Sequence, residues 1–133
     1  VLICYEAIFP YISRSVVNNG AALLINITND AWYGTTAAPY QLFSMTVFRA
    51  VENRRALVRA ANTGISGYID PAGRVRSKTG LYSEDAATST VPLLSERTFY
   101  TRYGDSFALL GIALVLVLAG WNLAEPLRRR LRR

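Results

Sequence analysis

The pattern of apolar and polar positions predicts short buried strands separated by a helix at the start of the chain. The apolar runs at 1–4 and 22–27 are short and partly β-branched, which is typical of buried strands. Between them, apolar residues recur at helical spacing from Pro10, and Gly20 is a favourable helix stop. A strand, a helix and a second strand in so short a span predict two parallel strands joined by a crossover.

The middle of the chain predicts a second helix and then an antiparallel hairpin. Residues 28–36 are polar and read as a loop, and an apolar stripe over 38–54 predicts the helix. Four short apolar runs predict further strands: 56–61, 65–69, 75–78 and 87–93. The D-P-A-G-R stretch at 70–74 predicts a turn, because Pro presets φ and Gly accepts a positive φ.

Near its end the chain carries eighteen residues without a charge, 107–124. At about 1.5 Å per residue a helix of this length reaches roughly 27 Å, close to the bilayer core. A long buried core helix is the alternative, but Trp121 near the end and the arginines that follow favour a membrane span. The predicted organisation is an α/β domain over 1–104, a transmembrane helix over 105–125 and a basic cytoplasmic tail over 126–133.

Charge and composition narrow the function classes. The net charge is +6, but five of the fifteen basic residues lie in the last six positions. Ten basic and nine acidic residues remain elsewhere, so the body has no basic face for nucleic acid. The chain has no histidine, which excludes Ser-His-Asp triads, Cys-His dyads and HExxH zinc sites within it. A single cysteine excludes an internal disulfide.

That cysteine, Cys4, stands at the end of the first predicted strand, where a helix is about to begin. Such a turn exposes a reactive atom and leaves backbone N–H groups free to stabilise an oxyanion, and the N–H of Tyr5 is the natural donor. Glu6 follows directly. The alternative is that Cys4 is a small buried hydrophobic residue. If it is a nucleophile, a carboxylate or a lysine must activate it, because histidine is absent.

Polar and aromatic residues also follow the second predicted strand. Asn26 lies at its end, and Asn29, Asp30 and Trp32 come just beyond it. Ligands in open α/β sheets bind outside the carboxyl ends of the strands, so these residues and Cys4 are expected on one rim. An Asx turn with a packed aromatic is the alternative. Asn29, Asp30 and Trp32 are the candidate substrate-binding residues.

Ordered motifs give the chain a family resemblance. The stretches C-Y-E-x-x-F-P, N-D-A-W-Y-G, R-A-x-E-x-x-R and R-A-x-N-T-G-I-S-G, in this order, resemble the C-terminal part of the nitrilase (carbon–nitrogen hydrolase) superfamily. The D-A-W-Y-G variant, R-Y-G-D at 102–105 and the terminal apolar segment resemble its membrane-bound branch, bacterial enzymes that acylate lipoproteins. The chain begins without Met and inside a strand, so it is expected to be a fragment of a longer protein.

The resemblance implies an αββα sandwich with a Glu–Lys–Cys triad and without metal or cofactor. Cys4 matches the nucleophile, Tyr5 and Glu6 match residues important in the superfamily, and Trp32 matches an aromatic residue near the acyl site. The superfamily Glu and Lys precede the Cys and are absent from this sequence. Glu6 is not the base, and Lys78, the only lysine, lies too far downstream.

The implied reaction is a ping-pong acyl transfer at the bacterial cytoplasmic (inner) membrane. Cys4 would take a fatty acyl chain from a phospholipid as a thioester and pass it to the amine of a diacylglyceryl-cysteine on an apolipoprotein. The catalytic domain would face the periplasmic side, and the C-terminus the cytoplasm. Two alternatives stay open: a membrane-anchored nitrilase-type amidase, and an inactive fragment or non-catalytic module.

Overall fold

The computed structural model describes the backbone of residues 1–131 and the side chains of residues 1–121. The chain divides into two compact units, Val1–Arg102 and Tyr103–Arg133. The first holds the sheet and its covering helices, and the second holds the long helix α4.

A mixed five-stranded sheet forms the first unit, with its strands in sequence order across the sheet. The strands are β1 (Leu2–Ile3), β2 (Leu23–Asn29), β3 (Ala56–Asn62), β4 (Gly67–Ile69) and β5 (Val75–Lys78). β1, β2 and β3 are parallel, whereas β4 runs antiparallel to both β3 and β5. The parallel pair and the antiparallel hairpin predicted from the sequence are both confirmed.

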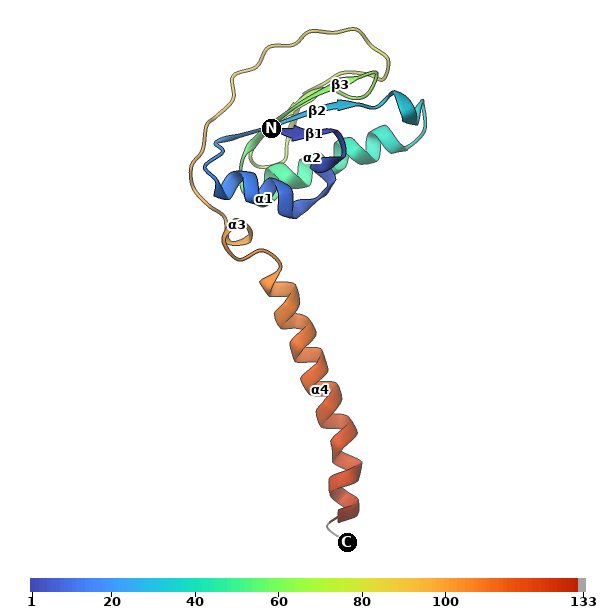
Figure 1. Ribbon diagram of the computed structural model, residues 1–133, viewed down its shortest axis with the longest axis vertical. Helices are drawn as coiled ribbons and strands as arrows, with labels where there is room; N and C mark the ends of the chain where they lie inside the picture. Colours follow the sequence, from blue (N-terminus) through green and yellow to red (C-terminus); the bar gives the residue numbers. More distant parts are fainter. Residues whose placement is uncertain (132–133) are drawn as a thin grey trace. The chain divides into compact units, whose positions relative to one another are not determined.

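Helices cover one side of this sheet. The helices of the whole chain, in chain order, are η1 (Cys4–Ile8), α1 (Pro10–Asn18), η2 (Ala31–Tyr33), α2 (Ala38–Asn53), α3 (Phe99–Tyr103) and α4 (Ser106–Leu131), and the last of these belongs to the second unit. α1 and α2 lie on the same side of the strands (Figure 1). Successive right-handed crossovers that step in one direction across a sheet place their helices on the same face.

The core lies between these helices and the sheet. Its buried members come from both layers and from the loop after β3: Val17, Leu24, Phe43, Ala50, Leu57, Ile65 and Ile69. Along β2 the inward positions are buried and the intervening ones are more exposed, as the period of two requires. On β1 and β2, the register partners Ile3 and Ile27 are 56% and 51% exposed, so this part of the opposite face is apolar and uncovered.

The turn between β4 and β5 shows why its sequence was predictive. Gly73 has φ +82°, the left-handed conformation that favours glycine. One carboxylate oxygen of Asp70 accepts the backbone N–H groups of Ala72 and Arg74, each at 2.9 Å. The bond from Arg74, helped by those from Ala72 and Arg76, holds the pKa of Asp70 below its ordinary value. The carboxylate therefore stays ionised and keeps the hairpin closed.

The structure differs from the sequence expectations in two places. The strand expected at 87–93 is wrong: this segment is an irregular connector, and its mostly exposed residues pair with no strand among those described. The 3-10 turn at Cys4–Ile8 was not predicted. Among the described residues no helix combines the length and the hydropathy needed to cross a membrane, so the membrane span expected at 105–125 stays a prediction. The side chains of the basic tail, 126–133, lie outside the described residues.

The close approach of β4 to β5 gives a stability prediction at Gly67. A Cβ at this position would lie 2.5 Å from the carbonyl oxygen of Ser77 and 3.2 Å from the Phe43 ring. We expect Gly67→Ala to lower the free energy of unfolding by about 1–3 kcal/mol, the usual cost of overpacking. Denaturant unfolding measures it. Gly80→Ala is the control, because a Cβ there meets Ser83 only at 3.8 Å or more. Equal losses in both variants would contradict the prediction.

Candidate functional site

Cys4 begins the 3-10 turn directly after β1, and its side chain is a free, exposed thiol. Its backbone has φ +48°, a left-handed conformation that is unusual for a residue with a side chain. A residue held in this region costs about 1–3 kcal/mol and persists only where its surroundings impose it. The structure therefore rejects the buried-filler interpretation of Cys4 and raises the question of what holds the turn.

The carboxyl ends of β1, β2 and β3 meet at one edge of the sheet. Ile3 pairs with Ile27, and Asn29 pairs with Asn62, so the residues after these strands lie on one rim. The backbone N–H of Asp30 donates to the carbonyl of Asn62 at 3.2 Å, which ties the second and third strand ends together. The shared rim expected for Cys4 and Asp30 is confirmed.

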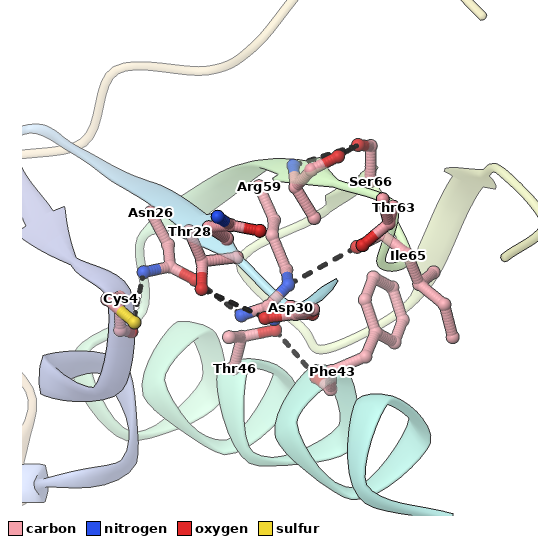
Figure 2. A network of polar contacts seen from close by, with 12 residues as sticks. Cys4, Asn26, Thr28, Asp30, Phe43, Thr46, Arg59, Thr63, Ile65 and Ser66 are labelled. Atoms are coloured by element: carbon pink, nitrogen blue, oxygen red, sulfur yellow. Dashed lines mark hydrogen bonds and ion pairs between the residues drawn. The ribbon is translucent and has the colours of Figure 1, made fainter. Parts of the chain in front are cut away.

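Asn26, on β2, forms hydrogen bonds with the backbone at the start of the turn. Its side chain is fully buried, and its Nδ2 donates to the carbonyl oxygens of Leu2 at 3.1 Å and Cys4 at 3.2 Å. Its Oδ1 accepts a hydrogen bond from Nη1 of Arg59. Figure 2 shows the Asn26 amide between Cys4 and Arg59. The backbone of the nucleophile candidate is thus bonded to a buried side chain.

Arg59, on β3, forms a buried ion pair with Asp30. Nη2 of Arg59 lies 2.7 Å from Oδ2 of Asp30, and both side chains are almost inaccessible to solvent. The hydroxyl of Thr28 donates to the other carboxylate oxygen at 2.9 Å, and Nε of Arg59 donates to the carbonyl of Ile65. The pair is tightly enclosed, since a Cβ on Gly64 would lie 2.2 Å from Oδ2 of Asp30.

A second arginine, Arg49 on α2, holds the other end of the turn. Its Nη1 donates to the carbonyl of Ile8 at 2.9 Å, and its Nη2 pairs with Glu52 at 2.7 Å. The side chain is nearly buried. η1 is therefore bonded to the sheet at its first residue and to α2 at its last.

The remaining sequence candidates lie at the surface. Oε2 of Glu6 accepts the backbone N–H of Ile3 at 2.7 Å, so this carboxylate closes the turn on the strand before it. The side chain of Asn29 accepts the N–H of Ala31, which is an Asx turn. Trp32 is 87% exposed and does not pack into the domain. Asp30 is the one substrate-binding candidate that is buried.

A narrow crevice, too small to hold a water molecule, lies beside Cys4, and several residues that the sequence did not single out line it. Its lining includes Cys4, Tyr5, Ile8, Tyr33, Leu42 and Arg59. Burial, followed by the charges of Tyr5, Cys4 and Asp30, raises the pKa of Tyr33, so its hydroxyl stays protonated. Nowhere in the described residues do three or more metal-ligating side chains gather.

Asn26 and Arg59 hold the Cys4 turn, and the sequence alone did not predict this role for either residue. Each is a polar residue inside an otherwise apolar run, L-L-I-N-I and A-L-V-R-A-A, and that interruption was the available signal. Their partnership becomes visible only in the sheet, where the two residues are direct register partners on β2 and β3.

The sequence of the chain is similar to those of known proteins. The sequence model described as carbon–nitrogen hydrolase matches residues 1–100. The chain is 54% identical over 122 residues to an apolipoprotein N-acyltransferase of Geobacter metallireducens, covering 90% of this chain and 23% of the relative. It is 44% identical over 117 residues to the apolipoprotein N-acyltransferase of Thermotoga maritima, covering 88% and 23%.

Solved structures give a more distant likeness. An amidase from Nesterenkonia sp. is 28% identical with a TM-score of 0.45, and the match covers 60% of this chain and 32% of the amidase. The present chain thus spans about a quarter of the curated relatives' length and a third of this amidase.

The buried ion pair gives a stability prediction with an internal control. Asp30→Asn leaves the Arg59 charge uncompensated in the interior, and we expect a loss of about 3 kcal/mol in the free energy of unfolding. Arg76→Gln is the control, because Arg76 also meets a carboxylate at 2.7 Å, that of Asp70, but is itself half exposed, and the backbone bonds to Asp70 stay in place. The control should cost about 1 kcal/mol or less in its ion pair. Denaturant titration of both variants decides, and an equal loss would contradict the burial argument.

Proposed function

This chain belongs to the carbon–nitrogen hydrolase family, and we propose that it is the nucleophile-bearing C-terminal part of an apolipoprotein N-acyltransferase. The eight relatives compared share that name at 41–54% identity. The activity proposed is that of the whole protein, since the chain spans only 22–24% of these relatives. The observation that carries the proposal is the exposed Cys4 thiol on a left-handed turn that buried side chains hold in place.

The chemistry proposed for this turn is nucleophilic acyl transfer. The thiolate of Cys4 attacks the ester carbonyl of a phospholipid acyl chain, a C–S bond forms, and the C–O bond to the lysophospholipid breaks. The backbone N–H of Tyr5 stabilises the oxyanion that develops on the carbonyl oxygen. The amine of a diacylglyceryl-cysteine on an apolipoprotein then attacks the thioester carbon and releases the thiol. The proton acceptor for Cys4 and a lysine at the oxyanion belong to the remainder of the protein.

Glu6 supports the turn in this proposal and does not act as the base. Its Oε2 is engaged by the N–H of Ile3, and this bond spans the turn that presents the thiol. Asn29 shapes the rim as the acceptor of the Ala31 N–H, and Asp30 acts from inside through Arg59. Of the proposed substrate-binding residues, Trp32 is left to contact the substrate directly.

The surface around Cys4 favours a lipid substrate over a small amide. Tyr5 and Phe9 contact edge to face with ring centroids 6.0 Å apart, and Phe9 contacts Tyr11 at 5.7 Å. All three rings are at least 38% exposed, and Trp32 adds a fourth exposed aromatic residue. Exposed aromatic groups beside a reactive thiol provide apolar area for acyl chains. This observation supports the transferase over the amidase alternative.

α4 is the proposed membrane anchor. The large apolar residues over its described side chains are 54% exposed or more, from Phe107 to Trp121. A helix that is apolar on all sides has no face suited to water. We place this helix in the bacterial cytoplasmic membrane, the catalytic domain on the periplasmic side and the arginine-rich end in the cytoplasm, as the positive-inside rule favours.

The uncovered sheet face fits a larger sandwich. Val1, Ile3 and Ile27 expose apolar side chains on or beside this face. In the proposed whole protein a second sheet covers them, which gives the αββα arrangement expected from the sequence. Burial of apolar area on a second layer is what such a face requires.

The nucleophile is tested in the whole protein that carries this chain. Cys4→Ala should abolish thioester formation, a loss of at least about 1,000-fold, because no other group can take the acyl chain. Incubation with an acyl-labelled phospholipid, followed by detection of label on the protein, measures this. Cys4→Ser controls for side-chain size and should carry no hydroxylamine-labile thioester. Label that persists on the Ala variant would remove Cys4 as the nucleophile.

The membrane placement of α4 is tested by labelling in a Cys4→Ser background. Val115→Cys should be protected from a water-soluble maleimide in intact membranes, because lipid surrounds the helix. Its own side chain is 64% exposed, so protein packing would not protect it. Ser95→Cys, at an exposed position of the connector, is the control and should react at once. Equal labelling rates at the two positions would contradict the placement.

A further inference from the structure

We propose that Arg59 is a positioning residue for Cys4 and that it acts through the side chain of Asn26. The inference rests on the proposed role of Cys4 as the nucleophile. Arg59 is 3% exposed, and its hydrogen bonds go to Asn26, Asp30 and Ile65 rather than to the thiol. Its influence on the reaction is therefore structural and local.

The polarity of the Asn26 amide requires a donor on its far side. The carbonyls of Leu2 and Cys4 can only accept, so the NH₂ end of the amide must face them. The oxygen end then faces β3, where a donor must meet it. Arg59 is permanently protonated and can only donate hydrogen bonds. It is therefore compatible only with this orientation of the amide. A water molecule or a hydroxyl would permit both orientations.

Arg59 is itself locked in place. Each of its three nitrogens has a different acceptor, the carbonyl of Ile65, Oδ1 of Asn26 and Oδ2 of Asp30. These acceptors come from the loop after β3 and from β2 and its end. The guanidinium fork therefore sets the Asn26 amide relative to two neighbouring strands. A lysine ammonium cannot span three separated acceptors in this way.

The turn at Cys4 needs the hydrogen bond from Asn26 because the backbone conformation of Cys4 is unfavourable in isolation. With φ +48°, the residue would relax toward an extended backbone if its carbonyl were released. Relaxation would swing the thiol away from the oxyanion site at the start of η1. A misplacement of about 1 Å lowers the rate of such a reaction by roughly 100-fold. The chain of contacts from Asp30 through Arg59 and Asn26 prevents this relaxation.

The test compares two buried arginines of the same strand region in the whole protein. Arg59→Lys should slow thioester formation from an acyl-labelled phospholipid by about 10- to 100-fold in single turnover. The phospholipid concentration that gives half the maximal rate should change little. Arg55→Lys is the control, since Arg55 is 1% exposed and also bonds backbone carbonyls, including those of Ala21 and Glu96. It lies at the opposite end of β3, so the control should acylate within about twofold of the parent.

Asn26→Asp is the second variant, and it leaves Arg59 and Asp30 in place. The carboxylate would set an acceptor against the carbonyls of Leu2 and Cys4, so acylation should fall by about 100-fold. If Arg59→Lys does not fold, the acylation rate of Asn26→Asp tests the proposal instead. The pH profile of Cys4 alkylation by iodoacetamide provides the second readout. This readout applies to Arg59→Lys, which keeps the positive charge: there, positioning lowers the alkylation rate without moving the midpoint of the profile.

Three results would overturn the inference. One is normal acylation by Arg59→Lys and Asn26→Asp; another is an equal slowing by Arg59→Lys and Arg55→Lys. The third is a shifted alkylation midpoint in Arg59→Lys, which would assign the arginine an electrostatic role. Failure of the proposed function has a different signature, because label would then remain on Cys4→Ala whatever occupies position 59.

Discussion

The buried ion pair between Arg59 and Asp30 is the interaction on which the rest of the site depends. A charge pair inside a protein is costly unless each polar atom is satisfied, and here Thr28, Asn26 and the Ile65 carbonyl provide the further bonds. The pair joins the end of β2 to the middle of β3. Through Asn26 it also reaches β1, so three parallel strands and the turn at Cys4 share one polar network.

The helix-covered face of the sheet and the rim at its strand ends have different roles. The helix-covered face buries the network and keeps water away from it, whereas the rim carries groups that a substrate can reach. Arg49 on α2 holds the end of the 3-10 turn, so the thiol is supported from the sheet and from a helix at once. Tyr5, Phe9 and Trp32 expose aromatic side chains near the turn, and α4 exposes apolar residues along its described length. Rigid polar support under an apolar surface suits acyl transfer between lipids.

Most of the fold could be predicted from local pattern. Hydrophobic period, Pro10, Gly20 and the turn chemistry at 70–74 all act over a few residues, and the elements they predicted are present. The segment at 87–93 failed because a strand needs a partner, and an apolar run does not specify one. The site was half predictable for the same reason. Cys4 stands at a visible strand end, but Asn26 and Arg59 are 33 residues apart and meet only through sheet register.

The central claim is that the turn held by Asn26 and Arg59 presents the Cys4 thiol as the acyl acceptor. Its most direct test is a structure of the whole protein in lipid, trapped with a slowly transferred acyl chain. The account predicts acyl density bonded to Sγ of Cys4, with the Asn26 amide still on the carbonyls of Leu2 and Cys4. An acyl group bonded to another residue, or a Cys4 turn released from Asn26 in the acylated state, would contradict it.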